Sequence, residues 1–378
     1  MLHSLRRLAA LLAIVLMVTG LLALPATAAP SAPTVAARAA VVVDASTGAV
    51  LWQRSAHTPV LVASTTKIMT ALVAEATYPP AKLFTVPLAA EQVDGTRFGY
   101  RTGMRIHRHD LLATLLMVSA NDAAETLAAA YPRGGRAGFL RAMQAMAESL
   151  GCTDSTWRSP SGLEAPGHRA SAADLAIVGR QLLAERELAQ LVGARTVRYR
   201  WPDGHVQTVT NHNHFVADGR DPGAIGVKTG YTVAAGRTIV AAERRAGRTL
   251  IAVALGTPSL RTEQADVRSM FAYGFATRPP SGGEILGGAA TARRGPSSAK
   301  STAAADLAAK GGPAPVAPAA VVHTGLASRL RARLLAAPVA VAVAGGTLLV
   351  VLGMLAVTVL RPRGGRVPAA GPHGDRAP

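Results

Sequence analysis

Cysteine and lysine are scarce in this chain, which has one cysteine and five lysines among its 40 basic residues. A single cysteine, Cys152, excludes a disulfide bond within the chain. A catalytic thiol is not favoured either, because the surrounding "LGCTDS" has the pattern of a helix end. Acidic residues number only 22, so the formal net charge is +18. No nucleic-acid recognition motif accompanies this charge, and we expect no nucleic-acid partner.

Uncharged runs occur near both ends of the chain, and the first follows the pattern of a secretory signal. Arg6 and Arg7 precede the apolar run "LAALLAIVLMVTGLLAL". Small residues then fit the cleavage rule at Ala26-Thr27-Ala28, so residues 1–28 are expected to form a signal peptide. An uncleaved membrane anchor is the alternative. The small-residue pattern favours cleavage, with a mature chain that starts near Ala29.

The second uncharged run is "APVAVAVAGGTLLVVLGMLAVTVL", residues 337–360. About 20 apolar residues suffice for a helix to cross a bilayer, so the run predicts a single transmembrane helix. Arginines flank it on both sides and leave the local charge rule ambiguous. The exporting signal sets the orientation: we expect the preceding chain outside the cell membrane and residues 361–378 as a short cytoplasmic tail.

Residues 279–325 are rich in Pro, Gly, Ala and Ser and contain almost no branched apolar side chain. A segment of this composition cannot bury a core, so we predict a disordered tether. Residues 38–278 remain for one folded domain.

Strand patterns lie at both ends of residues 38–278, and helical patterns lie between them. "AAVVVDASTGAVLWQR" predicts two strands, and three more are expected between residues 223 and 256. Helices are expected after Ser64, on both sides of residues 119–121, at "RAGFLRAMQAMAESLG", at "SAADLAIVGRQLLAER" with Ser171 as its cap, and at "TEQADVRSMFAYGFA". A hairpin is expected around residues 202–204. This order favours an α/β domain of the α+β type, with a mainly antiparallel sheet covered by helices.

The segment "VASTTKIMTAL" places Ser64 and Lys67 three residues apart on one face of a predicted helix. A serine hydroxyl is a poor nucleophile until a neighbour takes its proton. Lysine can take it when burial or nearby positive charge lowers the lysine pKa. Taken alone, this spacing is more often a helix cap with a surface lysine.

Two further motifs change that interpretation. Ser119-Ala120-Asn121 lies 55 residues after Ser64, and Lys228-Thr229-Gly230 lies 109 residues after Ser119, inside a predicted strand. The order S-x-x-K, S-x-N, K-T-G is typical of penicillin-recognising serine acyltransferases. With "SGL", "SAADLA" and "GVKTGYTVAAGRTIVA", residues 38–276 resemble the serine-type D-alanyl-D-alanine carboxypeptidases, the low-mass penicillin-binding proteins. The resemblance implies a DD-peptidase/β-lactamase-like fold.

The resemblance also implies a role for each motif residue. Ser64 would attack the carbonyl of the penultimate D-alanine, and Lys67 would accept its proton. Ser119 and Asn121 would line the opposite wall, with Ser119 able to relay the proton to the leaving amine. Lys228 would hold positive charge near Lys67 and the substrate carboxylate.

Four substrate contacts are implied as well. Thr229 would bind the substrate carboxylate, and Gly230 would allow close approach. The backbone N–H groups of Ser64 and Tyr231 would form the oxyanion hole. Arg237 would make a second carboxylate contact, although a solvated strand arginine is an equally good interpretation.

The resulting hypothesis is a membrane-anchored carboxypeptidase that acts on peptidoglycan stems ending in D-Ala-D-Ala and is acylated by β-lactam antibiotics. The alternatives are a β-lactamase, an endopeptidase and an inactive wall-binding module. No glutamate between the second and third motifs has Asn four residues later, and no tyrosine has Asn two residues later, so two β-lactamase hallmarks are missing. His212 and His214 have no third ligand at a recognised spacing, and "MRIHRHD" is interpreted in the same way, so no metal or cofactor is expected.

Overall fold

The structure is a computed structural model that describes residues 30–287, all of which belong to one unit. The predicted signal peptide, transmembrane helix and cytoplasmic tail, and most of the predicted tether, lie outside these residues. Within residues 30–287, no helix is both long and apolar enough to cross a membrane.

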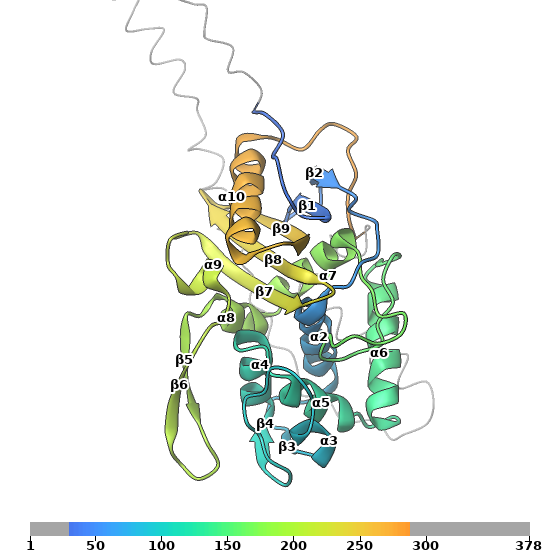
Figure 1. Ribbon diagram of the computed structural model, residues 1–378, viewed down its shortest axis with the longest axis vertical. Helices are drawn as coiled ribbons and strands as arrows, with labels where there is room; N and C mark the ends of the chain where they lie inside the picture. The colour runs from blue at the N-terminus through green and yellow to red at the C-terminus, as the bar shows by residue number, and fades with distance from the viewer. Residues whose placement is uncertain (1–29, 288–378) are drawn as a thin grey trace, which may run out of the picture. The chain divides into compact units, whose positions relative to one another are not determined.

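An antiparallel sheet of five strands runs through the domain in the order β2-β1-β9-β8-β7 (Figure 1). Its strands are β1 (Ala39–Asp44), β2 (Val50–Arg54), β7 (Ala224–Thr232), β8 (Gly236–Arg245) and β9 (Arg248–Thr257). The first two strands of the sequence therefore pair with the last, and β7 lies at one edge. This arrangement confirms the prediction of a mainly antiparallel sheet formed from the two ends of the domain.

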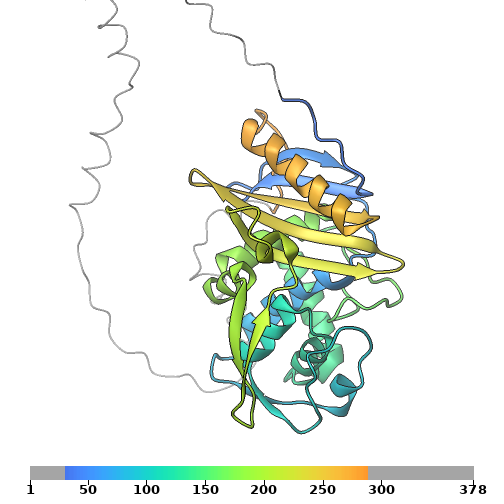
Figure 2. The same cartoon turned by 60° about the vertical axis from the view of Figure 1, so that its left-hand side comes forward.

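Helices cover both faces of the sheet (Figure 2). Successive strand residues point to opposite faces. Val42 accordingly packs with Phe271 of α10 (Leu260–Ala276) on one face. Val41 and Val43 belong to the larger core on the other face, with residues of α2 (Lys67–Thr77) and α7 (Ala172–Ala184). The predicted α/β fold with a covered sheet is confirmed.

The remaining helices and two small hairpins lie mostly below the sheet in Figure 1. The helices are η1 (Ala63–Thr66, a 3-10 turn), α3 (Leu88–Glu91), α4 (Arg108–Met117), α5 (Asn121–Ala129), α6 (Gly135–Ser149), α8 (Arg186–Gly193) and α9 (His214–Ala217). The hairpins pair β3 (Leu83–Thr85) with β4 (Arg105–His107), and β5 (Thr196–Arg200) with β6 (Val206–Thr210).

The longer helices and strands lie where local sequence patterns predicted them. The side chain of Ser171 accepts a hydrogen bond from the backbone N–H of Asp174, 3.0 Å away, which confirms the predicted cap of α7. The hairpin β5–β6 turns at residues 201–205, as Pro202-Asp203-Gly204 predicted. The sequence did not predict β3, β4, α3, α8 or α9, each of which has eight residues or fewer.

The predicted tether begins too early in the sequence. The backbone at residues 284–286 runs antiparallel beside β2, where the N–H of Val50 donates to the carbonyl of Glu284 and the N–H of Leu286 donates to the carbonyl of Gly48, each at 2.9 Å. Leu286 is buried. These contacts continue the folded domain to Gly287, because one buried leucine and an exposed sheet edge suffice to hold a segment whose overall composition predicted disorder.

Candidate active site

The predicted nucleophile and base lie together at the start of α2. Ser64 belongs to the 3-10 turn η1, and Lys67 is the first residue of α2. In a 3-10 turn, side chains three residues apart eclipse each other. The Nζ atom of Lys67 is 2.9 Å from Oγ of Ser64, within the range for direct proton transfer.

Three oxygen atoms contact the amine of Lys67. They are Oγ of Ser64 at 2.9 Å, Oδ1 of Asn121 at 2.7 Å and the carbonyl oxygen of Ser161 at 2.5 Å. The amide of Asn121 is oriented by its own Nδ2, which donates to the carbonyl of Asp94 at 2.7 Å. Oδ1 and the Ser161 carbonyl can only accept hydrogen bonds. A neutral amine satisfies both with its two N–H groups, and its lone pair is then free for the Ser64 hydroxyl.

Burial favours this neutral form. Lys67 is fully buried, and desolvation lowers its pKa well below the usual value. Positive charge on Lys228 lowers the Lys67 pKa further, whereas Glu125 and Asp122 act in the opposite direction. The net shift is downward and favours the neutral amine, the form that can act as a base.

A loop at residues 159–163 holds η1 and α2 in place. Gly162 has φ +85°, and a Cβ atom there would lie 2.0 Å from the carbonyl oxygen of Ala63, so only glycine fits. The hydroxyl of Thr70 donates to the carbonyl of Pro160 at 2.5 Å. The segment "SGL" is part of the family resemblance, but nothing in its sequence indicates the contact between the Ser161 carbonyl and Lys67.

The second motif forms the turn between α4 and α5. Asn121 begins α5, and its backbone N–H donates to the carbonyl of Thr96 at 2.7 Å. Ser119 has φ +65°, an uncommon backbone conformation that often marks functional sites. Its side chain is partly exposed and, among the described residues, its hydroxyl forms no hydrogen bond with Ser64 or Lys67. The structure therefore joins Asn121 directly to Lys67 and leaves Ser119 beside the site.

The third motif lies on the edge strand β7, which contacts η1. A Cβ atom on Gly230 would lie 2.7 Å from the backbone nitrogen of Ser64 and 2.6 Å from Oγ1 of Thr238. The strand can therefore approach the nucleophile only with glycine at this position. Alternate N–H groups of an edge strand point away from the sheet, as the implied oxyanion contact from Tyr231 requires.

Lys228 is also fully buried, and its Nζ donates to the carbonyl of Thr229 at 2.7 Å. Burial lowers the pKa of Lys228 to about 7, against an opposing effect of Glu263.

Cross-strand partners share a face of the sheet, and Arg237 is paired with Tyr231. Thr229 and Arg237 thus project from one face of the sheet and Lys228 from the other. The guanidinium of Arg237 lies 5.4 Å from the centre of the exposed Tyr231 ring.

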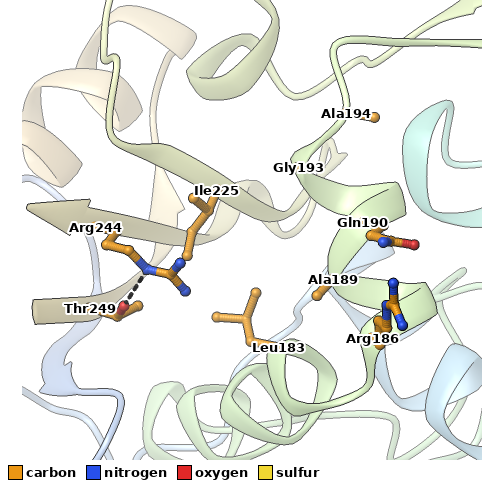
Figure 3. Close-up of a pocket in the computed structure, with 9 residues that line it drawn as sticks. All are labelled: Leu183, Arg186, Ala189, Gln190, Gly193, Ala194, Ile225, Arg244 and Thr249. Atoms are coloured by element: carbon orange, nitrogen blue, oxygen red, sulfur yellow. Dashed lines mark hydrogen bonds between the residues drawn. The ribbon is translucent and has the colours of Figure 1, made fainter. Parts of the chain in front are cut away.

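A cavity of about 480 Å³ lies elsewhere, between α8 and the strands β7 to β9 (Figure 3). Leu183 and Ile225 form part of its apolar wall, and Arg186 and Arg244 are its cationic residues. None of the predicted site residues lines it. Among residues 30–287, no group of three or more His, Cys, Asp or Glu side chains could hold a metal ion.

Comparisons with known proteins agree with this geometry. A family described as D-alanyl-D-alanine carboxypeptidase, peptidase S11, matches residues 26–259. The chain is 34% identical to the D-alanyl-D-alanine carboxypeptidase DacB2 of Mycobacterium tuberculosis, over 63% of this chain and 82% of that protein. It is 33% identical to a D-alanyl-D-alanine endopeptidase of Pseudomonas aeruginosa, over 57% and 70% of the two chains. A crystal structure of a D-alanyl-D-alanine carboxypeptidase from Mycobacterium tuberculosis superposes with a TM-score of 0.63 at 31% identity, covering 69% of this chain and 98% of that one. With the three motifs assembled around Ser64, these matches show that the chain belongs to the D-alanyl-D-alanine carboxypeptidase family of serine peptidases.

Proposed function

We propose that this enzyme removes the terminal D-alanine from peptidoglycan stem peptides through an ester formed on Ser64. The observation that carries the mechanism is the environment of Lys67, whose amine touches Ser64 Oγ and otherwise contacts only neutral oxygens. Burial among such partners favours the neutral amine, which is the form that can take the proton of Ser64.

In the first step, the proton of the Ser64 hydroxyl moves to Lys67 Nζ while Oγ bonds to the carbonyl carbon of the penultimate D-alanine. The developing oxyanion accepts hydrogen bonds from the N–H groups of Ser64 and Tyr231. The proton then passes to the leaving nitrogen as the C–N bond breaks, and Ser119 is the proposed relay. Water hydrolyses the ester, which releases the shortened peptide and restores Ser64.

The substrate carboxylate is proposed to lie beside β7, at Thr229 and Arg237, with buried Lys228 acting on it from the other face of the strand. Lys228 contributes positive charge, and the hydroxyl of Thr229 contributes a hydrogen bond. Arg237 projects from the same sheet face as Thr229, so both side chains can reach one carboxylate.

A β-lactamase would need a group that activates water to clear the penicillin ester. The hydrogen bonds described around Ser64 and Lys67 include no carboxylate partner. We therefore expect penicillin to form a long-lived adduct on Ser64. Intact-protein mass spectrometry should detect one adduct per chain, and Ser64→Ala should eliminate it. Rapid turnover of a chromogenic cephalosporin without a surviving adduct would favour a β-lactamase instead.

Substrate assays separate carboxypeptidase from endopeptidase, the activity named for the Pseudomonas aeruginosa relative. The enzyme is incubated with a pentapeptide stem and, separately, with crosslinked stem dimers, and the products are weighed by mass spectrometry. Release of a single alanine from the pentapeptide supports the proposal. Cleavage of the dimers alone would reassign the enzyme as an endopeptidase. If the chain is an inactive wall-binding module, neither substrate is cleaved.

The proposed location is the outer face of the cell membrane, with one spanning helix at residues 337–360. This proposal is supported by the uncharged length of that run and by the signal-like pattern of residues 1–28. Protease added to intact cells should release the catalytic domain by cutting between residues 288 and 336. A domain that is cut only after lysis would refute this topology.

A further inference from the structure

Glu164 lies at the C-terminal end of β7. Its Oε1 atom accepts a hydrogen bond from the hydroxyl of Thr232, the last residue of β7, at 3.1 Å. Glu164 follows Gly162 by two residues, and Gly162 packs against the residue before Ser64. The loop that supports the nucleophile therefore also carries this carboxylate.

Glu164 is an unusual group in so basic a chain. Its side chain is exposed, and it forms no ion pair with any Arg, Lys or His among residues 30–287. One carboxylate oxygen is held by Thr232, which fixes the side chain at the strand end, and the other oxygen faces no described partner. A fixed carboxylate without a cation is suited to receive one from a ligand.

The geometry of β7 indicates which part of a substrate reaches Glu164. Gly230 marks the point where the strand passes Ser64, and Thr229 lies on the carboxylate side of that point. Strand residues advance about 3.3 Å each, and an extended peptide beside the strand advances at nearly the same rate. In the proposed mechanism the scissile carbonyl of the penultimate D-alanine accepts a hydrogen bond from the N–H of Tyr231, so the substrate residue before it lies one step farther along the strand, beside Thr232.

We propose that Glu164 is a specificity-determining residue that binds a free side-chain ammonium group on the residue preceding D-Ala-D-Ala. Glu164 would thus make the enzyme favour stem peptides whose third-residue side-chain amine is free over those in which that amine is acylated. This inference rests on the proposed function, because it uses the position of the scissile carbonyl at Ser64.

The test compares two peptides, Nα-acetyl-L-Lys-D-Ala-D-Ala and the same peptide with its ε-amine acetylated. Release of D-alanine by the full-length enzyme gives kcat/KM for each. Exposed ion pairs are weak and screened by salt, so we expect the free amine to be favoured by about three- to fivefold at low ionic strength. The preference should fall toward one at about 0.5 M salt.

Three variants locate the effect. Glu164→Gln should bring the ratio of the two kcat/KM values close to one, and Glu164→Lys should reverse it and favour a peptide with a succinylated ε-amine. Glu284→Gln makes the same charge change beside β2, at the opposite edge of the sheet, and should retain the wild-type ratio. Equal rates for both peptides in the wild type, or an unchanged ratio in Glu164→Gln, would refute the subsite while leaving the carboxypeptidase assignment intact. Release of D-alanine from neither peptide would refute that assignment and the subsite with it.

Discussion

His168 gives the sharpest prediction about how the site is held together. The ring is buried, and its Nδ1 atom accepts a hydrogen bond from the backbone N–H of Arg158 at 3.1 Å. An N–H group can only donate, so Nδ1 carries no proton and Nε2–H donates to Oγ1 of Thr66, 2.9 Å away. Thr66 lies between Ser64 and Lys67. Neutral His168 thus ties the loop at residues 158–168 to the turn that carries the nucleophile.

Protonation of this buried ring lowers the free energy of unfolding. Burial lowers the pKa of His168 from 6.5 to about 4. Between those two pH values, the unfolded chain binds a proton that the folded chain does not, so the stability that neutral His168 contributes is complete above pH 6.5 and decreases as the pH falls. The difference between the two pKa values corresponds to about 3 kcal/mol of unfolding free energy, which is lost between pH 6.5 and 4.

Urea unfolding of the purified protein across this pH range measures the effect. The substitution His168→Gln removes the titrating group and should flatten the decrease in unfolding free energy between pH 6.5 and 4. His57 is the matched control. Burial lowers its pKa, but hydrogen bonds to Asp154 and Glu284 outweigh this effect and raise the pKa overall. Stability contributed by His57 is therefore present below pH 6.5 and lost as the pH rises through the raised pKa, so His57→Gln should leave the acid decrease in place. An acid decrease of wild-type size in His168→Gln would refute the assigned role of His168.

Three further predictions concern acylation, measured with a fluorescent penicillin. Lys67→Arg should slow acylation by at least about a hundredfold, because guanidinium stays charged and cannot accept the Ser64 proton; near-normal acylation would remove Lys67 from the role of base. In the wild-type enzyme, the acylation rate should fall as the pH drops through the lowered pKa of Lys67; the same profile in Lys67→Arg would assign the titration to another group. Gly230→Ala should slow acylation roughly a hundredfold, because the new Cβ would lie 2.7 Å from the backbone nitrogen of Ser64 and would push β7 away from η1. A smaller effect than tenfold would show that the two elements need not touch.

The parts of the fold that the sequence predicted are those with strong local signals. The strand runs around Val41 and Val240 are continuous and apolar because both faces of the sheet are covered. The helix at α7 has a capping serine, and the hairpin β5–β6 has a Pro-Asp-Gly turn. The short elements could not be predicted, because a strand of three residues such as β3 shows no usable periodicity.

The same contrast holds within the site. Ser64, Lys67, Asn121 and Lys228 could be found because their side chains define motifs. The Ser161 carbonyl could not be found, since every residue has a backbone carbonyl and its contact with Lys67 depends on how the loop folds over α2. Glu164 was also missed as a functional candidate, because its relation to Thr232 spans 68 residues of sequence and appears only when the loop meets the end of β7.

Lys67 can be neutral because the nearby acids form their hydrogen bonds and ion pairs with other groups. Glu125 and Asp122 are the carboxylates that raise the pKa of Lys67, and a direct ion pair with either would keep the lysine charged. Glu125 instead binds Nε of Arg136 at 2.7 Å, and Asp122 accepts hydrogen bonds from the backbone N–H groups of residues 98–100. Lys67 is left with neutral oxygens as partners. Desolvation then dominates its pKa, and the lysine is free to take a proton from Ser64.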